Sequence, residues 1–502
     1  MLARSCGAAL LLASLALAQQ SVYPVRSTAL AYDSGALDNP AAVERVVWSQ
    51  DVAVPGDWLQ LHFGACVLAA GSRLSIRPLA RPDWVQWHDA GSLADYRGWS
   101  CQFSGPTLRV ELLAAPGSTG NRARLDTVVA LDVGSAIEDD TICGTTDDRV
   151  LGSDPRQCRL DAGCTAWLFS EYAVGTAGHC MSTTAGHILH FNVPLSTASG
   201  TPQPSHPNDQ YAMDAFHPFL NNGVGNDWSV SAALRNSNTR LYPGVAQGSW
   251  YTVVPAPGFV ATQVIRITGY GSGNGTSGSA TWNLVQKTHT GLRQSTTTAT
   301  ALRYGVDTTG GNSGSPVIFE ATGQVVGVHT HGGCTSTSGG NSGTDAVRSD
   351  WTTARQQALA LHVPGAVTPF GAGCPGGPGV PLLQLVGFPE IGQNVSALVT
   401  GLTQSSSAGL LVGGSSSTSW NGSPLPLDLA SGGMAGCSLF VAFDFSDVVL
   451  TALGTGGRAY LLPNDQALVG VHVYLQYFGL DAAAPNPMGV AGTNAIDVLL
   501  GS

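Results

Sequence analysis

The stretch that decides the fold reads Thr-Thr-Gly-Gly-Asn-Ser-Gly-Ser-Pro, at residues 308–316. Its serine, Ser313, is surrounded by glycines that let a reacting carbonyl group approach the backbone closely. The backbone N–H groups of Gly311 and Ser313 can then point at the oxyanion that develops on that carbonyl. An apolar run at 317–319 follows and is expected to hold the loop from behind as a strand. The stretch therefore predicts a serine nucleophile on a glycine-rich turn of a β-structure.

A histidine that can activate this serine comes earlier, in Thr-Ala-Gly-His-Cys at residues 176–180. A serine hydroxyl is a weak nucleophile at neutral pH, and a histidine can be its base because the histidine pKa lies close to the operating pH. The histidine needs a carboxylate that fixes its tautomer and stabilises the imidazolium. Asp227 is favoured because it begins a short alternating run, and Asp214 is the alternative. The candidate catalytic residues are His179, Asp227 and Ser313.

The motifs around these residues resemble those of the trypsin-like (chymotrypsin-fold) serine proteases. The resemblance covers roughly residues 143–361 and rests on Thr-Ala-Gly-His-Cys, Asn-Asp-Trp and Gly-Asn-Ser-Gly-Ser-Pro in that order. It implies two six-stranded antiparallel β-barrels with the catalytic residues in the cleft between them. It also implies hydrolysis of protein or peptide substrates through an acyl-enzyme, and a disulfide between Cys164 and Cys180 across the histidine loop.

Within that family the chain looks most similar to the glutamyl endopeptidases. The similarity lies in Gly-Thr-Thr-Asp-Asp-Arg at residues 144–149, in the serine loop, and in Gly-Val-His at residues 327–329. It implies that Thr308 and His329 bind the substrate carboxylate, so that cleavage follows Glu and, less efficiently, Asp. A pocket for Lys or Arg would need a buried carboxylate, and the nearest acid before the serine is Asp307.

Two features concern processing. Many animal members of the family carry Asp at the position of Asn312, and that Asp receives the freed N-terminal ammonium when the zymogen is cut. Neutral Asn312 cannot form this ion pair, so any activation must work differently. Three acidic residues, 138–140, stand before the segment that resembles a mature start. A maturation cut is therefore predicted near Glu138 to Thr141, with a solvated acidic linker that is never cleaved as the alternative.

The composition describes the rest of the chain. Charged residues make up 11% of the 502 residues, and 64 glycines and 28 prolines favour turn-rich β-structure over long helices. Short alternating runs predict a β-sandwich at 19–137 and another at 374–502. Between them lie a protease-like domain at 138–364 and a Pro/Gly linker at 365–373. The protease-like domain is expected to end with an amphipathic helix over 349–361. We expect an all-β chain: a chymotrypsin-like double β-barrel flanked by N-terminal and C-terminal β-sandwich domains.

Residues 1–18 have the features of a secretory signal peptide, with Arg4, an apolar run, and small residues before Gln19. No later stretch reaches the roughly 18 apolar residues that a membrane helix needs. The mature protein is therefore expected to be secreted, either extracellular or periplasmic, where disulfides persist.

The cysteines suggest a disulfide framework. Cys66 with Cys101, and Cys374 with Cys437, are the simplest pairs in the two sandwiches. Cys334 is expected to bond either Cys143 or Cys158. A similarity to the lysyl endopeptidases favours Cys143, which leaves Cys158 unpaired.

Several function classes are not expected. The net charge of −11 argues against nucleic acid, no cofactor motif is present, and His329 and His331 lack the spacing of a zinc-binding helix, so no metal is expected. Trp84, Trp87 and Trp99 are predicted to lie in the sandwich core, with carbohydrate or surface contact through the flanking domains as the alternative. The competing hypothesis for the whole chain is a secreted binding or adhesive protein with a vestigial protease domain.

Overall fold

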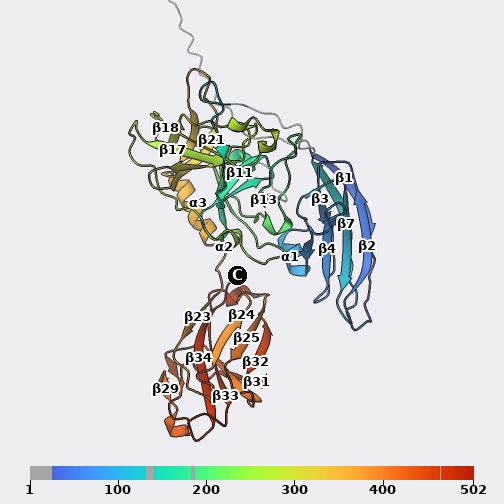
Figure 1. Cartoon of the computed structure of the whole chain (residues 1–502), viewed down its shortest axis with the longest axis vertical. Coiled ribbons are helices and arrows are strands. Elements are labelled where there is room, and N and C mark those ends of the chain that lie inside the picture. Colours follow the sequence, from blue (N-terminus) through green and yellow to red (C-terminus); the bar gives the residue numbers. More distant parts are fainter. Residues whose placement is uncertain (1–24, 132–140, 182–186, 464) are drawn as a thin grey trace, which may run out of the picture. The chain divides into compact units, whose positions relative to one another are not determined.

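A computed structural model of the chain describes residues 25–131, 141–181, 187–463 and 465–502. It is nearly all-β, as predicted, and three short α-helices interrupt the strands in these residues (Figure 1). Among them, no helix is long and apolar enough to cross a membrane. The predicted signal peptide and the acidic residues 138–140 lie outside the described part. The chain divides into two compact units, residues 1–359 and 360–502.

The first unit begins with a β-sandwich of two four-stranded antiparallel sheets, ordered β1-β8-β3-β6 and β2-β7-β4-β5. Along β7, buried residues alternate with partly exposed ones, which is the pattern predicted for a sandwich strand. Leu61, Leu74 and Val110 are fully buried in its apolar core. The elements are β1 (Val25–Asp33), β2 (Arg45–Ala53), β3 (Trp58–Phe63), β4 (Arg73–Pro78), β5 (Gln86–His88), α1 (Ala90–Asp95), β6 (Phe103–Ser104), β7 (Thr107–Ala114) and β8 (Arg124–Leu131).

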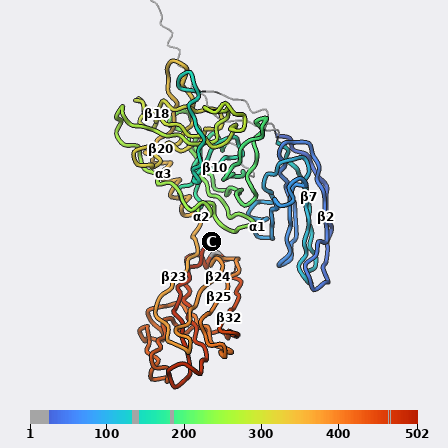
Figure 2. The backbone as a smooth tube through the Cα atoms, viewed as in Figure 1, coloured from blue at the N-terminus to red at the C-terminus, as the bar shows by residue number. Residues whose placement is uncertain are grey.

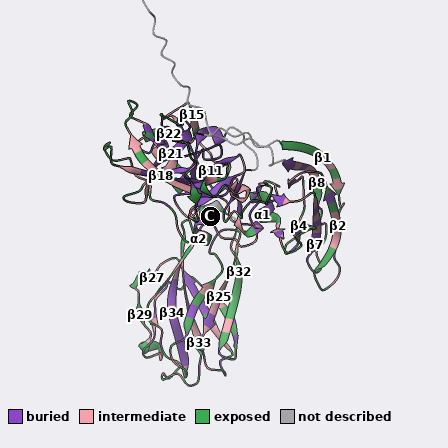
Figure 3. Ribbon diagram, turned by 45° about the horizontal axis from the view of Figure 1, so that its top comes forward, coloured by how far each residue is buried: buried purple, intermediate pink, exposed green. Residues whose placement is uncertain are grey.

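Two further antiparallel sheets form the chymotrypsin-like part of the fold, in the middle of the chain (Figure 2). The second of them, β17-β20-β21-β22-β19-β18, closes into a six-stranded barrel because β17 also pairs with β18, and β9 extends it beside β18. The first, β14-β13-β10-β11-β12-β16-β15, has seven strands and shows no pairing between its edge strands among the described residues. Strands β11, β21 and β22 are buried almost throughout (Figure 3).

The strands of the first sheet are β10 (Gln157–Leu160), β11 (Cys164–Leu168), β12 (Ala173–Thr176), β13 (Ile188–His190), β14 (Gln210–Ala212), β15 (Phe219–Asn221) and β16 (Asp227–Ala232). Those of the second are β9 (Val150–Leu151), β17 (Val264–Gly269), β18 (Lys287–Gln294), β19 (Ala301–Tyr304), β20 (Pro316–Phe319), β21 (Gln324–His331) and β22 (Asn341–Asp345), and the helices are α2 (Pro243–Gln247) and α3 (Ser349–Leu359).

The closing helix of this part is confirmed as α3, which ends two residues earlier than predicted. Its residues Trp351, Ala354 and Ala358 are buried, so the predicted apolar stripe is the face that packs. At its start, the carboxylate of Asp350 accepts the N–H of Trp351 at 2.8 Å.

The second unit, residues 360–502, is built on one eight-stranded antiparallel sheet, ordered β23-β34-β33-β26-β31-β32-β25-β24. Its apolar core contains Leu411, Tyr477 and Ile496. The strands are β23 (Ala366–Phe370), β24 (Leu382–Val386), β25 (Asn394–Thr400), β26 (Ala408–Gly414), β27 (Ser419–Trp420), β28 (Ser423–Pro424), β29 (Leu427–Asp428), β30 (Ser438–Leu439), β31 (Phe445–Ala452), β32 (Thr455–Leu461), β33 (His472–Leu480) and β34 (Val490–Leu499).

The expected linker at 365–373 was wrong, because these residues contain strand β23, which pairs with β34 over its whole length. The strand tolerates Pro369 because it lies at the edge of its sheet, where one side of the backbone needs no partner.

Three predicted disulfides are present: Cys143–Cys334, Cys164–Cys180 and Cys374–Cys437. The predicted bond between Cys66 and Cys101 is absent, and both are free thiols, as is Cys158. The reason is their different surroundings. The sulfur of Cys66 accepts the N–H of Arg124, whereas Cys101 is fully buried and lies against the carbonyl of Pro207.

Trp84, Trp87 and Trp99 of the N-terminal sandwich are half-buried, so the prediction that they belong to the core was wrong. Each ring packs against a different basic or histidine side chain: Trp84 against Arg81, Trp87 against Arg73, and Trp99 against His62. With their faces covered in this way, they give no support to a carbohydrate-stacking surface.

Candidate active site

The imidazole of His179 is placed by a short 3₁₀ turn, η2 (Gly178–Met181), which follows β12. The next residue, Cys180, is bonded to Cys164 at the start of β11, so the turn is tied to a buried strand. His179 is only 7% exposed. Its ring orientation is therefore fixed by its covalent and packing surroundings before any substrate arrives.

Asp227 is the first residue of β16, and it is fully buried. One carboxylate oxygen accepts the backbone N–H groups of Gly178 at 2.6 Å and His179 at 3.1 Å. The other lies 2.6 Å from Nδ1 of His179. The alternative carboxylate, Asp214, instead accepts the N–H of Phe216 in its own loop at 2.7 Å.

Ser313 lies between β19 and β20, and its Oγ is 2.8 Å from Nε2 of His179. The loop is held from both sheets. The N–H of Thr165 on β11 donates to the Ser313 carbonyl at 2.7 Å, and the N–H of Gly314 donates to the His329 carbonyl on β21 at 2.8 Å. The structure thus brings together a hydroxyl, an imidazole and a carboxylate that are far apart in the sequence.

The backbone before Ser313 makes a tight turn that only glycine accommodates easily. Gly311 has a φ of +96°, and a Cβ there would lie 2.5 Å from the carbonyl oxygen of Tyr270. The carbonyl of Gly311 accepts the hydroxyl of Thr165 at 2.9 Å, while the carbonyl of Gly310 accepts the N–H of Ser272 at 2.7 Å. Both carbonyls are engaged on the protein side, and the N–H of Asn312 donates to the carbonyl of Thr309 at 3.0 Å. The N–H groups of Gly311 and Ser313 have no partner among the described residues and can serve another acceptor.

The two residues predicted to bind a substrate carboxylate lie close to this loop, and both are fully buried. The hydroxyl of Thr308 accepts the side-chain N–H of Asn341 at 2.7 Å and lies 3.1 Å from the hydroxyl of Thr141. Nδ1 of His329 lies 2.8 Å from the hydroxyl of Tyr304. Burial, with smaller contributions from the nearby His331 and His179, lowers the pKa of His329 to about 3.

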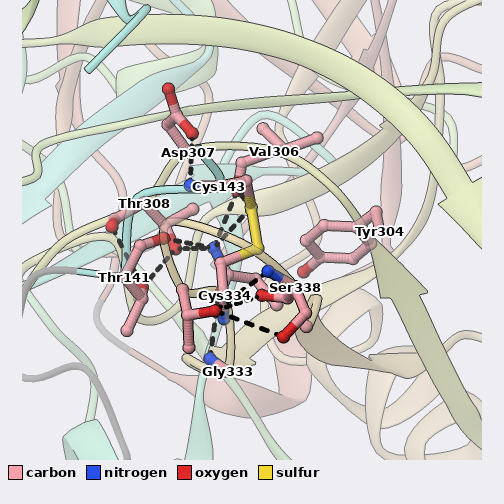
Figure 4. Close-up of a disulfide and its surroundings, with 12 residues drawn as sticks. Thr141, Cys143, Tyr304, Val306, Asp307, Thr308, Gly333, Cys334 and Ser338 are labelled. Carbon is pink, nitrogen blue, oxygen red and sulfur yellow. Dashed lines mark hydrogen bonds between the residues drawn. A yellow bond between two sulfur atoms is a disulfide. The ribbon is translucent and has the colours of Figure 1, made fainter. Parts of the chain in front are cut away.

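Asp307, the acid that a pocket for Lys or Arg would need, is turned away toward the segment at 141–149. Its two carboxylate oxygens accept the N–H groups of Cys143 at 2.7 Å and Asp148 at 2.8 Å (Figure 4). Asp148, His289 and Asp307 bring three possible metal-ligand atoms within 4.8 Å of one another. Because backbone N–H groups already occupy both oxygens of Asp307, we assign no ion to this cluster.

Sequence reasoning missed three residues at the site. Asn341 and Tyr304 reach Thr308 and His329 from β22 and β19, and neither lies in a motif that would have revealed it. The third, Arg149, is buried and contacts the loop of Ser313 directly. Its only sequence signal is its place in the Asp-Asp-Arg segment, which indicated a similarity to the glutamyl endopeptidases but not a contact with the serine loop.

Comparison with known proteins agrees with this geometry. Residues 145–347 match the family described as Trypsin. Among solved structures, the thermostable serine protease AL20 from an extremophilic microorganism is 13% identical, covering 41% of this chain and 98% of its own, with a TM-score of 0.32. An inactivated protease paralogue of the scabies mite, S-I1, is 12% identical, covering 43% and 99%, with a TM-score of 0.32.

A search of curated proteins found no match. The family match covers the residues whose two β-sheets bring His179, Asp227 and Ser313 together. It does not distinguish the glutamyl endopeptidases from other members, so that assignment stays a prediction. Residues 145–347 are a trypsin-like serine protease domain, and the chain that carries them is a serine endopeptidase.

Proposed function

We propose that Ser313 is the nucleophile of this endopeptidase, His179 its general base and then general acid, and Asp227 the carboxylate that orients the histidine. The observation that carries the proposal is the continuous hydrogen-bonded series from Asp227 through His179 to Ser313, at 2.6 and 2.8 Å. The carboxylate holds the proton on Nδ1 of His179, so that Nε2 is free to accept the proton of the serine hydroxyl.

The reaction runs in two halves. Oγ of Ser313 attacks the scissile carbonyl as its proton passes to Nε2 of His179, and the N–H groups of Gly311 and Ser313 stabilise the oxyanion. The imidazolium then gives that proton to the leaving amine, which breaks the peptide bond and leaves an acyl-enzyme. A water molecule repeats the sequence, with His179 again as base and acid, and releases the second product.

Labelling with a fluorophosphonate, followed by mass mapping, tests these roles. The wild-type protein should be labelled at Ser313, and the Ser313→Ala and His179→Ala variants should each lose on the order of 10⁴-fold or more in turnover without unfolding. Asp227→Asn should be severely impaired and Asp214→Asn should not. An unlabelled wild-type protein would overturn the nucleophile, and a dead Asp214→Asn beside an active Asp227→Asn would overturn the carboxylate.

We further propose that the enzyme prefers Glu, and less strongly Asp, before the scissile bond, with Thr308 and His329 as the residues that bind it. Thr308 accepts a hydrogen bond from the side-chain amide of Asn341, so its own hydroxyl can donate, either to the hydroxyl of Thr141 at 3.1 Å or to a substrate carboxylate. His329 has a pKa lowered to about 3 and is neutral at pH 7. A substrate carboxylate beside it would raise that pKa again, and the resulting charge-assisted hydrogen bond would favour acidic substrates.

The position of Asp307 supports this preference over one for Lys or Arg. Both of its carboxylate oxygens already accept backbone N–H groups of the segment at 141–149. Asp307 is therefore held toward that segment and would have to give up these bonds to pair with a cationic substrate side chain.

A peptide library with Glu, Asp, Lys, Phe or Ala before the cleaved bond tests the preference, with Ser313→Ala as the blank. Thr308→Ala and His329→Gln should lose Glu substrates by about 10-fold or more, the cost of about one charge-assisted hydrogen bond, while Ser313 still reacts with the fluorophosphonate. The matched control is His472→Gln in the second unit, which is half-exposed. Efficient cleavage after Lys, Arg or large apolar residues, with none after Glu, would contradict the preference and leave the triad intact.

We also propose that the protein is exported and processed. Three disulfides in the described residues and the signal-peptide pattern at the N-terminus support export. Three acidic residues before Thr141 are a suitable target for an enzyme that cuts after acids, so we expect the exported precursor to be cut near Glu138 to Thr141. N-terminal sequencing of active enzyme from the medium tests both export and processing. An N-terminus that begins at Gln19 would contradict the cut near Glu138 to Thr141.

A further inference from the structure

Arg149 is a buried cation next to the serine loop. It is 1% exposed and lies just before β9. Its guanidinium forms a two-point ion pair with Asp147, with N–O distances of 2.8 and 2.7 Å. The remaining donors reach the loop: Nη1 donates to the hydroxyl of Thr309 at 2.6 Å and to Oδ1 of Asn312 at 3.3 Å. A buried charge so fully hydrogen-bonded is costly to move, and it fixes what it touches.

The same guanidinium also binds Ser272, which is itself hydrogen-bonded to the serine loop. Nη2 of Arg149 donates to the carbonyl of Ser272 at 2.8 Å, and the hydroxyl of Thr309 donates to that carbonyl at 3.0 Å. The N–H of Ser272 in turn donates to the carbonyl of Gly310 at 2.7 Å. A Cβ on Gly271 would lie 2.5 Å from Nη1 of Arg149, so this glycine makes the room that the guanidinium needs.

These contacts set the direction of one peptide group. In a trans peptide, the carbonyl of Gly310 and the N–H of Gly311 point to opposite sides. Because Ser272 holds that carbonyl on the interior side, the N–H of Gly311 is directed outward, toward the oxyanion of the proposed mechanism. The side chain of Asn312 locks the same turn, since its Oδ1 also accepts the N–H of Thr309 at 3.1 Å.

We propose that Arg149 is a positioning residue that holds the oxyanion-binding peptide of the Ser313 loop in its competent orientation, and that the uncut chain is competent for this reason. The inference rests on the proposed role of Ser313. Because Arg149 supplies a cation from within the chain, the loop needs no newly freed N-terminal ammonium. This agrees with a neutral Asn at position 312, which cannot form an ion pair with such an ammonium. A cut near Glu138 to Thr141 would then break the chain between the two domains without switching the site on.

A second anchor keeps the segment of Arg149 on the loop. Cys143 is bonded to Cys334, and its N–H donates to Asp307, in the segment between β19 and the serine loop (Figure 4). A second buried cation, Lys287, lies on the interior side of the serine loop. Its ammonium donates to the carbonyl of Gly271 at 2.8 Å, and the next carbonyl along the chain, that of Ser272, is the one that Arg149 binds. Both cations thus bind adjacent carbonyls behind the loop.

The chain offers a matched control in Arg156. Its guanidinium pairs with Asp154 at 2.8 and 2.7 Å, in the same Asp-x-Arg arrangement as Asp147 and Arg149. It stacks on the ring of Tyr251, 3.8 Å from the ring centroid, and its guanidinium forms no hydrogen bond or ion pair with the serine loop among the described residues. Substitution of Arg156 therefore removes an equivalent local ion pair without touching the oxyanion-binding peptide.

The test measures the rate of fluorophosphonate labelling at Ser313 per folded molecule, in full-length Arg149→Met, Arg149→Lys, Arg149→Ala and Arg156→Met. Circular dichroism and thermal unfolding give the folded fraction. We expect the Arg149 variants to react about 100-fold more slowly, the loss typical of one oxyanion donor, and Arg156→Met to react within about threefold of wild type. Guanidinium ion, at concentrations far below those that unfold the protein, should partly restore Arg149→Ala, and methylammonium should not.

A second arm examines cutting. In a Glu138→Gln, Asp139→Asn, Asp140→Asn variant, the band labelled by the fluorophosphonate should have the length of the uncut chain and react at the wild-type rate. Arg149 variants that label as fast as wild type, a guanidinium ion that restores nothing, or labelling confined to cut chains would each overturn the inference. An unlabelled wild-type protein would instead overturn the role of Ser313, so the two failures are distinguishable.

Discussion

The N-terminal and C-terminal β-domains look alike in sequence, but they are stabilised in different ways. The apolar core of the N-terminal sandwich continues into the protease domain, where Ile188 and Ala212 belong to the same buried cluster. Residues 360–502 form a separate compact unit with an apolar core of their own. That unit also holds the disulfide Cys374–Cys437, whereas Cys66 and Cys101 in the N-terminal sandwich are not bonded.

Buried side-chain amides join the N-terminal sandwich to the protease domain. Gln102 of the sandwich and Gln210 of the protease domain are both buried and are joined by two hydrogen bonds of 2.8 Å. The side-chain amide of Gln210 accepts the backbone N–H of Gln102 and donates to its carbonyl. His190 also lies 3.0 Å from the side-chain oxygen of Gln102. Polar groups are buried only where partners are available. Gln102 therefore lies on the surface of the N-terminal sandwich that packs against the protease domain.

The largest expected effect comes from removing the N-terminal domain, and removal of the C-terminal domain is the comparison. A chain without residues 25–131 should lose at least about 10-fold in activity per mole, since its protease domain would expose Ile188, Ala212 and the polar groups that Gln102 satisfies, and about 1.4 kcal/mol already changes a folding equilibrium tenfold. A chain without residues 360–502 should keep its activity within about twofold, because every candidate site residue lies in the first unit. Both are measured as fluorophosphonate-reactive sites per mole of purified protein.

Equal activity in the two shortened chains would remove the distinction between the domains. An inactive chain without residues 360–502, beside an active one without residues 25–131, would reverse it.

The next effect is that of the disulfide. Cys437→Ser should lower the stability of the second unit by about 4 kcal/mol, the chain-entropy value for a bridge that closes a loop of 63 residues. Cys66→Ser is the control and should change stability little, because no bond is lost. Calorimetry of both variants, with peptide mapping without reduction, checks the result. A peptide that links Cys66 to Cys101 would contradict the structure.

The three residues proposed as the triad could be named from the sequence because each lies in a short motif of chemically informative residues. Glycines around Ser313 and a cysteine beside His179 are local features, and Asp227 was favoured over Asp214 because a strand begins at it. The structure shows that this local reasoning selects the carboxylate that contacts the imidazole. The sandwich strands were predictable for a similar reason, since alternation of apolar and polar residues is itself local.

What failed depends on contacts between distant segments. Arg149 reaches Thr309 and Asn312, some 160 residues later in the chain, and no sequence motif marks that meeting. Pairing Cys66 with Cys101 by elimination assumed a proximity that the fold does not provide. A Pro- and Gly-rich composition at 365–373 was taken as a linker, although an edge strand tolerates both residue types.

A smaller effect is expected from the amide contact between the N-terminal sandwich and the protease domain. Gln210→Ala should cost about 1–3 kcal/mol, because it leaves the buried N–H and carbonyl of Gln102 without partners. Gln384→Ala, at an exposed position on β24 of the second unit, should stay within about 0.5 kcal/mol. Urea unfolding of the two variants gives both values. Equal losses would mean that the buried amides do not join the two domains.

The effect that is smallest at neutral pH is the response of buried histidines in the first unit to acid. Burial is the main cause that lowers the pKa of His88 to about 3 and the pKa of His190 well below its usual value, and nearby cations, Arg240 and Arg159, add to it. Both rings are therefore neutral when folded, but they take up a proton when unfolded below about pH 6.5. The stability they contribute is present above that pH and is lost as the pH falls toward 3, at about 1.4 kcal/mol per pH unit for each ring. In His190→Asn, unfolding of the first unit should depend on pH with a slope smaller by one proton, whereas His472→Asn, at a half-exposed position in the second unit, should leave that slope unchanged. A slope that is the same in His190→Asn and wild type would show that His190 does not remain neutral between the two domains.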